Sequence, residues 1–127
     1  MRLPKIILLV DDDDTGLYII KRLINKHSIE TEVLIARNGQ EALAIMHELC
    51  GQEQCPELIL LDIQMPVMDG FEFLAQFRKV AHLHRSSLKI VLLSSSTHPL
   101  DLEEAKKYPL IDFLEKPLTQ EKLLKLM

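Results

Sequence analysis

Apolar residues occur along the chain in two different patterns. Three segments are continuous aliphatic runs, which are typical of strands buried on both faces of a sheet. These runs are Ile6–Val10, Leu58–Leu61 and Ile90–Leu93. Two shorter and less purely apolar runs, Glu32–Ala36 and Ile111–Leu114, predict strands at the edges of the same sheet.

Between these runs, apolar residues recur at the spacing of helices that bury one face. The stretch from Val80 to Leu88 is long and predicts an extended third helix or an extended loop after it. Thr119 is suited to cap the last helix, which has room for about two turns. The repeats are Leu17, Ile20 and Ile24; Leu43, Met46 and Cys50; Leu74, Phe77 and Ala81; Leu102 and Ala105; and Leu123 and Met127.

Five strands alternating with five helices predict a parallel sheet with right-handed crossovers and helices on both faces. Five such units suit the flavodoxin-like strand order 2-1-3-4-5. We therefore expect one α/β domain over residues 1–127, a (βα)5 doubly wound parallel sheet. A chain of this length buries enough surface to fold without a disulfide or a metal.

Charge and hydropathy narrow the classes of partner. The formal net charge of −4 disfavours a nucleic-acid surface, which needs clustered positive charge. The apolar run Ile6–Val10 is too short for a signal peptide or a membrane span, and aspartates follow it directly. We therefore expect a cytoplasmic protein without a nucleic-acid or membrane partner.

The cysteines and histidines carry no evident site. A disulfide scaffold would need more cysteines than Cys50 and Cys55, and a structural zinc site would need further ligands nearby. We therefore predict two free thiols. No histidine has a cysteine or carboxylate at ligand spacing, and we predict surface or loop positions for all of them. They are His27, His47, His82, His84 and His98.

Polar residues follow four of the predicted strands. Asp11 and Asp12 come after the first strand, and Asp62 comes after the third. Ser94 follows the fourth strand and Lys116 the fifth. In this topology ligands bind at the carboxyl ends of the strands, so we expect these side chains to lie together at one edge of the sheet.

The chemistry of this set is that of phosphoryl transfer. Three carboxylates at one edge repel each other unless a cation lies between them, and an oxygen-rich, water-accessible site suits Mg²⁺. A hydroxyl and an ammonium group opposite them suit a phosphoryl group, whose oxygens carry negative charge. A carboxylate can itself be the nucleophile and form an aspartyl-phosphate. The other two aspartates of the run, Asp13 and Asp14, are candidates for the N-cap of the first helix.

The same residues lie in segments that resemble the response regulator receiver (CheY-like) family over essentially the whole chain. The segments are Ile7–Asp12, Leu60–Gly70, Leu92–Ser95 and Asp112–Pro117, and the part from Asp62 to Gly70 is highly specific. By this resemblance the chain is a two-component phosphoacceptor that takes a phosphoryl group from a histidine kinase or a histidine phosphotransfer protein. It would catalyse only its own phosphorylation and dephosphorylation, and so would not be an enzyme for other substrates.

The resemblance also implies a role for each site residue. Asp62 would be the phosphoacceptor and a metal ligand. Asp12 would bind Mg²⁺ directly, Asp11 mainly through a water molecule, and the backbone carbonyl of Gln64 would complete the protein ligands. Two further positions follow in the next segments of the family pattern.

Ser94 would hydrogen-bond the phosphoryl group and Lys116 would pair with it. Phe113 occupies a switch position, and together with Ser94 it would pass the signal to a protein-interaction face. Gln64 and Ser96 stand where family members vary and where the lifetime of the phosphoryl group is set. The chain has no room for an attached output domain, so we expect the signal to pass to an unidentified downstream protein. The chain could be a stand-alone regulator or a piece of a larger kinase, and the sequence does not distinguish these two alternatives.

Two alternatives belong to other functional classes. The residues from Asp11 to Thr15 also match the first motif of haloacid-dehalogenase-type phosphatases, in which the first aspartate is the nucleophile. That family needs a further acidic pair on a later strand, and too few residues follow Lys116 to supply it. A degenerate receiver that only binds other proteins would lack a site residue, and none is missing.

Overall fold

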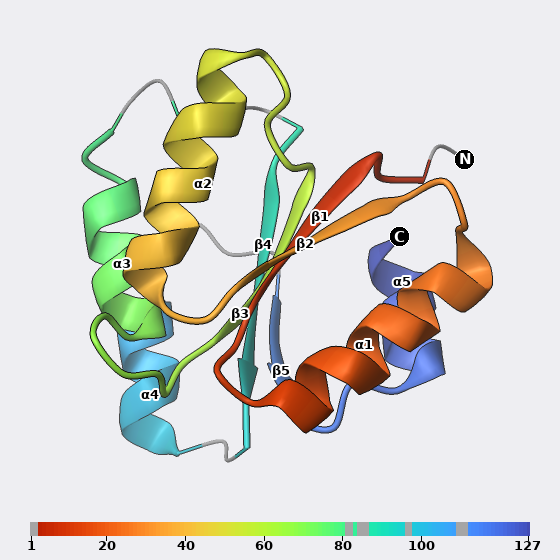
Figure 1. Ribbon diagram of the computed structural model, residues 1–127. Coiled ribbons are helices and arrows are strands. Elements are labelled where there is room, and N and C mark those ends of the chain that lie inside the picture. The colour runs from red at the N-terminus through yellow and green to blue at the C-terminus, as the bar shows by residue number, and fades with distance from the viewer. Residues whose placement is uncertain (1–2, 81–82, 84–86, 96–97, 109–111) are drawn as a thin grey trace.

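The computed structural model describes residues 3–80, 83, 87–95, 98–108 and 112–127 (Figure 1). Five strands form one sheet in the order β2-β1-β3-β4-β5, and every neighbouring pair is parallel. This is the predicted flavodoxin-like order. The strands are β1 Ile6–Val10, β2 Glu32–Ala36, β3 Leu58–Asp62, β4 Lys89–Ser94 and β5 Asp112–Glu115.

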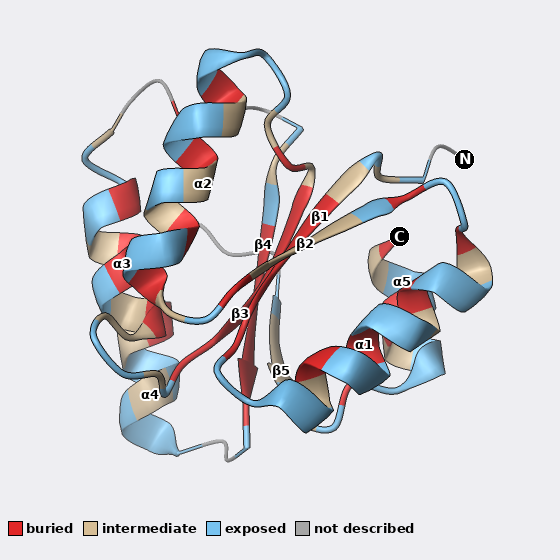
Figure 2. Cartoon of the chain, in the orientation of Figure 1, coloured by how far each residue is buried: buried red, intermediate tan, exposed pale blue. Residues whose placement is uncertain are grey.

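Burial follows the position of each strand in the sheet (Figure 2). All five residues of the central strand β3 are buried, whereas β2 and β5 keep partly exposed side chains. The continuous aliphatic runs are therefore the inner strands, and the less apolar runs are the edges, as predicted. Ile111, the first residue predicted for the fifth strand, lies outside the described residues.

Helices cover both faces of the sheet (Figure 1), with α1 and α5 on one face and α2, α3 and α4 on the other. Side chains alternate along each strand, so Leu8 faces the second group and Leu9 the first. Within the described residues, no helix combines the length and the apolar character needed to cross a lipid bilayer. The helices are α1 Asp14–His27, α2 Gly39–Gly51, α3 Gly70–Phe77, α4 Pro99–Ala105 and α5 Gln120–Leu126.

Side-chain caps define where several helices begin. Asp13, not Asp14, is the N-cap of α1, and its carboxylate accepts from the backbone N–H of Thr15 at 3.2 Å. Thr119 caps α5 as predicted, accepting from the backbone N–H of Lys122 at 3.2 Å. These caps satisfy N–H groups that have no partner within the helix.

The long stretch from Val80 to Leu88 follows the third helix, and only part of it lies within the described residues. α3 ends at Phe77, and Arg78 is its C-cap, so the helical spacing that ran on to Ala81 overestimated the helix. Ala81 itself lies outside the described residues. Leu83, which the structure does describe, is fully buried and belongs to the core on the α2 and α3 side of the sheet.

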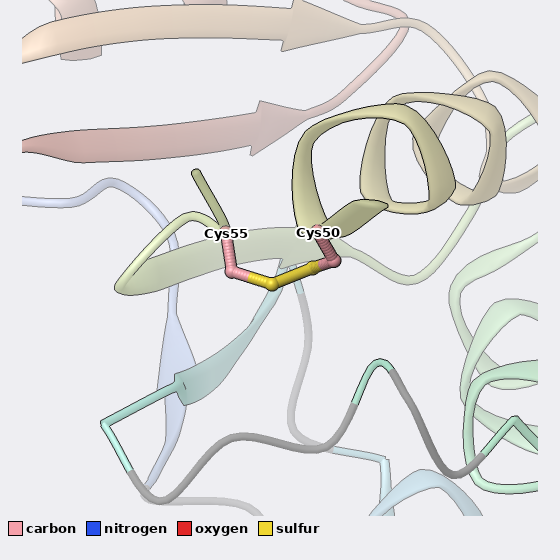
Figure 3. Close-up of a disulfide and its surroundings, with 2 residues drawn as sticks. All are labelled: Cys50 and Cys55. Atoms are coloured by element: carbon pink, nitrogen blue, oxygen red, sulfur yellow. A yellow bond between two sulfur atoms is a disulfide. The ribbon is translucent and has the colours of Figure 1, made fainter. Parts of the chain in front are cut away.

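A disulfide joins Cys50 and Cys55, so the prediction of two free thiols is wrong (Figure 3). α2 ends at Gly51, and Glu53 adopts a positive φ of 60° that turns the chain back on itself. The two Cα atoms are consequently 4.3 Å apart. Cysteine count and spacing do not reveal such a turn, because it depends on the backbone angles of the residues between the two cysteines.

We expect the disulfide to contribute about 2 kcal/mol to the free energy of unfolding, a small value because the loop it closes is short. Addition of a reductant should lower the midpoint of urea unfolding of the native sequence. The Cys55→Ser variant is the control, because Cys55 is partly exposed whereas Cys50 is buried in the core. The urea midpoint of Cys55→Ser should not change when reductant is added. Alkylation of both cysteines in the air-oxidised native protein would contradict the cross-link.

Candidate functional site

The four predicted strand ends meet at one edge of the sheet. Asp11 directly follows β1, Asp62 ends β3 and Ser94 ends β4. Asp62 pairs with Leu93, so Ser94 extends one residue beyond it along the sheet. The backbone N–H of Lys116, just after β5, donates to the carbonyl oxygen of Ser94 at 2.6 Å. The parallel sheet therefore brings residues from four separate segments to one place.

Three carboxylates gather at this edge. One oxygen atom each of Asp11, Asp12 and Asp62 lies within 4.8 Å of the others. Asp11 and Asp62 are buried and Asp12 is exposed, so the group opens to solvent on one side. Oxygen ligands with access for water are what Mg²⁺ and similar hard cations prefer. The cluster therefore fits a divalent metal.

Lys116 lies between the two buried carboxylates. Its Nζ atom donates to Oδ2 of Asp11 at 3.0 Å and is 3.2 Å from Oδ1 of Asp62. Burial disfavours the charged form of Lys116, but its hydrogen bond to Asp11 and the negative charge of Asp62 outweigh burial, so its pKa is raised. Lys116 therefore remains an ammonium ion beside the carboxylates at neutral pH.

Asp62 has the most perturbed acidity in the site. Burial raises its pKa, the charge of Lys116 lowers it, and the charge of Asp11 raises it again, with a resulting pKa of about 6. Three carboxylates and one ammonium leave a net charge of −2 when all are ionised (−3 + 1), which a divalent cation would neutralise. Asp62 is thus a carboxylate that burial holds at higher free energy than an exposed one.

Backbone contacts hold Asp11 in position. Its N–H donates to the carbonyl oxygen of Ala36 at 3.0 Å, which continues the pairing of β1 with β2. Its Oδ1 atom accepts from the N–H of Asp13 at 3.0 Å. Because Asp13 in turn caps α1, the start of the helix and the carboxylate of Asp11 are fixed together.

Gln64 lies in the loop between β3 and α3. This loop is closed by the N–H of Gly70, which donates to the carbonyl oxygen of Ile63 at 2.8 Å. It is also joined to α2, since the N–H of Gly39 donates to the carbonyl oxygen of Met68 at 2.8 Å. Gln64 is exposed, and its predicted role as a ligand through the backbone carbonyl stays a prediction.

The predicted switch residues lie on two neighbouring strands, Ser94 at the end of β4 and Phe113 in β5. Ser94 is buried, and Phe113 in β5 is half-buried and packs against the core formed with α2, α3 and α4. The movement of these two residues on phosphorylation stays a prediction. Ser96, where the phosphoryl lifetime was expected to be set, lies outside the described residues.

The described histidines partly follow the prediction of surface or loop positions. His47 is exposed on α2, and His98 is exposed and caps α4, accepting from the N–H of Leu100 at 3.1 Å. His27 is half-buried at the end of α1, and its Nε2 atom is buried. His82 and His84 lie outside the described residues.

Sequence reasoning missed an apolar groove beside the carboxylates. A pocket of about 300 Å³ lies between α1 and the segment after β5. The sequence carried a signal for this groove, because the apolar residues Tyr18 and Ile19 lie off the helical repeat of Leu17, Ile20 and Ile24. In the structure their side chains are 64% and 50% exposed. The lining residues are Asp11, Asp13, Gly16, Ile19, Ile20, Ser95, Lys116, Pro117 and Leu118.

Comparison with known proteins identifies the family. A sequence model of the response regulator receiver domain matches residues 7–127. The chain belongs to the response regulator receiver family. PilH of Pseudomonas aeruginosa is 31% identical to this receiver over 119 residues, which cover 94% of this chain and 91% of that protein. The match over residues 7–127 leaves the phosphatase alternative without support.

Solved receiver structures share the fold. The phosphorylated cyanobacterial phytochrome response regulator RcpA matches with a TM-score of 0.81 at 27% identity, covering 98% of this chain and 89% of that chain. The Mn²⁺-bound form of the response regulator Rcp1 matches with a TM-score of 0.76 at 30% identity, covering 97% and 88%. The acidic cluster of this receiver is thus found in a fold for which a divalent-metal complex is known.

We expect Asp62 to titrate at about pH 6 in metal-free buffer. The folded chain then binds a proton that the unfolded chain, with a pKa of about 4, has released, so the free energy of unfolding falls as pH rises from about 4 to 6. Carboxylate ¹³C NMR measures the midpoint. The Lys116→Met variant should have a higher titration midpoint for Asp62, because it lacks the nearby positive charge, whereas Lys122→Met should keep the native midpoint. A midpoint at about pH 4 in the native sequence would contradict the argument that burial raises the pKa.

We expect divalent cations to bind at the carboxylate cluster and Asp12→Asn to weaken that binding at least about tenfold, since even substitutions one layer from a metal cost this much. Calorimetric titration with Mg²⁺ and with Mn²⁺ provides the affinities. Asp14→Asn is a matched control, because Asp14 belongs to the same aspartate run but pairs with Arg37 outside the cluster. Equal affinity in the two variants would place the cation elsewhere.

Proposed function

We propose that the chain is the phosphoacceptor of a two-component phosphorelay and that Asp62 takes the phosphoryl group. The observation that carries this proposal is the position of Asp62, a buried carboxylate in contact with Lys116 and within 4.8 Å of the Asp11 and Asp12 carboxylates. The donor is a phosphohistidine of a histidine kinase or a histidine phosphotransfer protein. Receiver family membership supports this class of donor.

In the proposed reaction, an ionised oxygen of Asp62 attacks the phosphorus atom of the phosphohistidine. The phosphorus–nitrogen bond breaks, its electron pair stays on the departing imidazole, and an aspartyl-phosphate forms. With a pKa of about 6, Asp62 is mostly ionised at neutral pH and can act as the nucleophile. The chain would catalyse this transfer and the later hydrolysis only on itself.

Asp11, Asp12, Asp62 and the carbonyl of Gln64 would hold Mg²⁺, which would neutralise charge on the phosphoryl oxygens when bound. The protein's own contribution is positioning and a second positive charge. Lys116, already 3.2 Å from Asp62, can exchange its contact with the carboxylate for one with a phosphoryl oxygen.

Ser94 and Phe113 are proposed to convert the phosphoryl group into a signal. Phosphorylation adds negative charge and hydrogen-bond acceptors at the edge of the sheet, and the hydroxyl of Ser94 would donate to one of them. Phe113 is half-buried, so it can turn inward as Ser94 moves. The surface of α4, β5 and α5 would change for an unidentified downstream protein. This change would be a shift in population between two existing conformations.

The groove beside α1 is proposed to receive the donor protein. Its lining is mostly apolar, yet Asp11 and Lys116 reach it from the site, and Ile19 is half-exposed at its border. Tyr18 is a second exposed apolar residue on the same helix. Exposed apolar side chains next to a reactive group are suited to a protein partner, since a small phosphodonor needs no such surface.

Incubation with acetyl phosphate and Mg²⁺ should add one phosphoryl group to the native sequence, measured by mass spectrometry of the intact protein. Asp62→Asn should abolish the labelling, because the amide is not a nucleophile of this kind. Asp13→Asn is the matched control, because asparagine caps a helix as well as aspartate and the charge change is the same. Labelling of Asp62→Asn together with loss of label in Asp11→Asn would instead favour the phosphatase alternative.

A further inference from the structure

Gly70 begins α3, and its role in the fold is to leave space beside the site. Among the described glycines none has a positive φ, so backbone freedom does not explain the residue. A methyl group at Gly70 would overlap the carbonyl oxygen of Asp62. It would also lie 3.0 Å from the Cα atom of Ile63 and 3.2 Å from the carbonyl carbon of Asp62. The first turn of α3 therefore rests directly on the backbone of the proposed phosphoacceptor.

A hydrogen bond joins the same two segments. The N–H of Gly70 donates to the carbonyl oxygen of Ile63 at 2.8 Å. The three atoms nearest to such a methyl group all belong to the backbone, so rotation of a side chain cannot relieve these contacts. Gly51 is different, because a methyl group there would have no neighbour within 4 Å.

Neither α3 nor the loop before it can easily move aside. Asp69 and Glu72 form a capping box around the first turn of α3. Phe73 and Leu74 are buried in the core, so a shift of the helix would disturb close packing. The preceding loop is also bonded to α2 through the N–H of Gly39.

We propose that Gly70 is a positioning residue for Asp62. By letting α3 lie against the end of β3, it fixes the peptide from which the Asp62 side chain projects, and with it the distances to Lys116 and Asp11. This inference rests on the proposed function of Asp62. A reacting group must be held within roughly 0.5 Å of its productive position, and a misplacement of about 1 Å can slow a reaction about a hundredfold.

The test compares Gly70→Ala with two control variants. Gly51→Ala makes the same chemical change in open space. Phe77→Leu removes core volume from the same helix, since Phe77 is buried and stacks on Phe73, but leaves the contact with Asp62 intact. Phe77→Leu therefore reports what loss of stability alone does to the site.

We expect Gly70→Ala to slow labelling by acetyl phosphate and Mg²⁺ at least about tenfold, with weaker Mg²⁺ binding and a changed ¹³C resonance of the Asp62 carbonyl. Gly51→Ala and Phe77→Leu should keep the native rate, affinity and resonance. If labelling is slowed equally in Phe77→Leu and Gly70→Ala, the slower labelling results from lower stability alone, and the proposal is overturned. A native rate in Gly70→Ala would also overturn it.

A measurement on the native sequence covers the case in which Gly70→Ala does not fold. The ¹⁵N amide resonance of Gly70 should shift when Asp62 is phosphorylated, whereas that of Gly51 should stay unchanged. An unchanged Gly70 resonance would overturn the proposal. The two proposals fail in different ways. Labelling of the Asp62→Asn variant would refute Asp62 as the phosphoacceptor. Loss of label in Asp62→Asn, together with a native labelling rate in Gly70→Ala, would refute only the positioning role of Gly70.

Discussion

The contact of Lys116 with two buried aspartates is the interaction on which the site depends. Its ammonium group donates to Asp11 at 3.0 Å and lies 3.2 Å from Asp62. Charged groups away from water cost free energy unless they are paired, and here one cation serves two carboxylates. Burial raises the pKa of Asp62 most, Lys116 lowers it and the charge of Asp11 raises it again, with a resulting pKa of about 6. The same excess of negative charge suits the cluster to bind a divalent cation.

This contact exists only because the sheet holds distant segments together. Asp11 and Lys116 are separated by 105 positions in the chain. β1, β3 and β4 are buried between two layers of helices, so the ends of these strands have little freedom to move relative to each other. The parallel direction of all five strands puts their carboxyl ends at one edge. The aliphatic core thus fixes the geometry of a site made entirely of polar groups.

The loop after β3 adds a second constraint, which comes from space and not from charge. Gly70 and Gly39 allow α3 and α2 to approach the loop closely, and each donates its N–H to a backbone carbonyl of that loop. Val67, in the same loop, has a positive φ of 69°, a conformation that β-branched residues rarely adopt. Such strain persists only where the surrounding structure holds the backbone in place. The loop next to Asp62 is therefore held in place by backbone hydrogen bonds from the first residues of α2 and α3.

The order and type of the elements were determined by the sequence itself, because continuous aliphatic runs, helical spacing and capping residues act locally. The same holds for the cap by Thr119 and for the arrival of Asp62 and Lys116 at one edge, which follows from strand order, whereas the sequence left the cap of α1 open between Asp13 and Asp14. Only the tertiary structure decided the Cys50–Cys55 cross-link and the close approach of Gly70 to Asp62. It also decided the raised pKa of Asp62. These features depend on individual backbone angles and on distances between segments remote in the chain, which no local pattern contains.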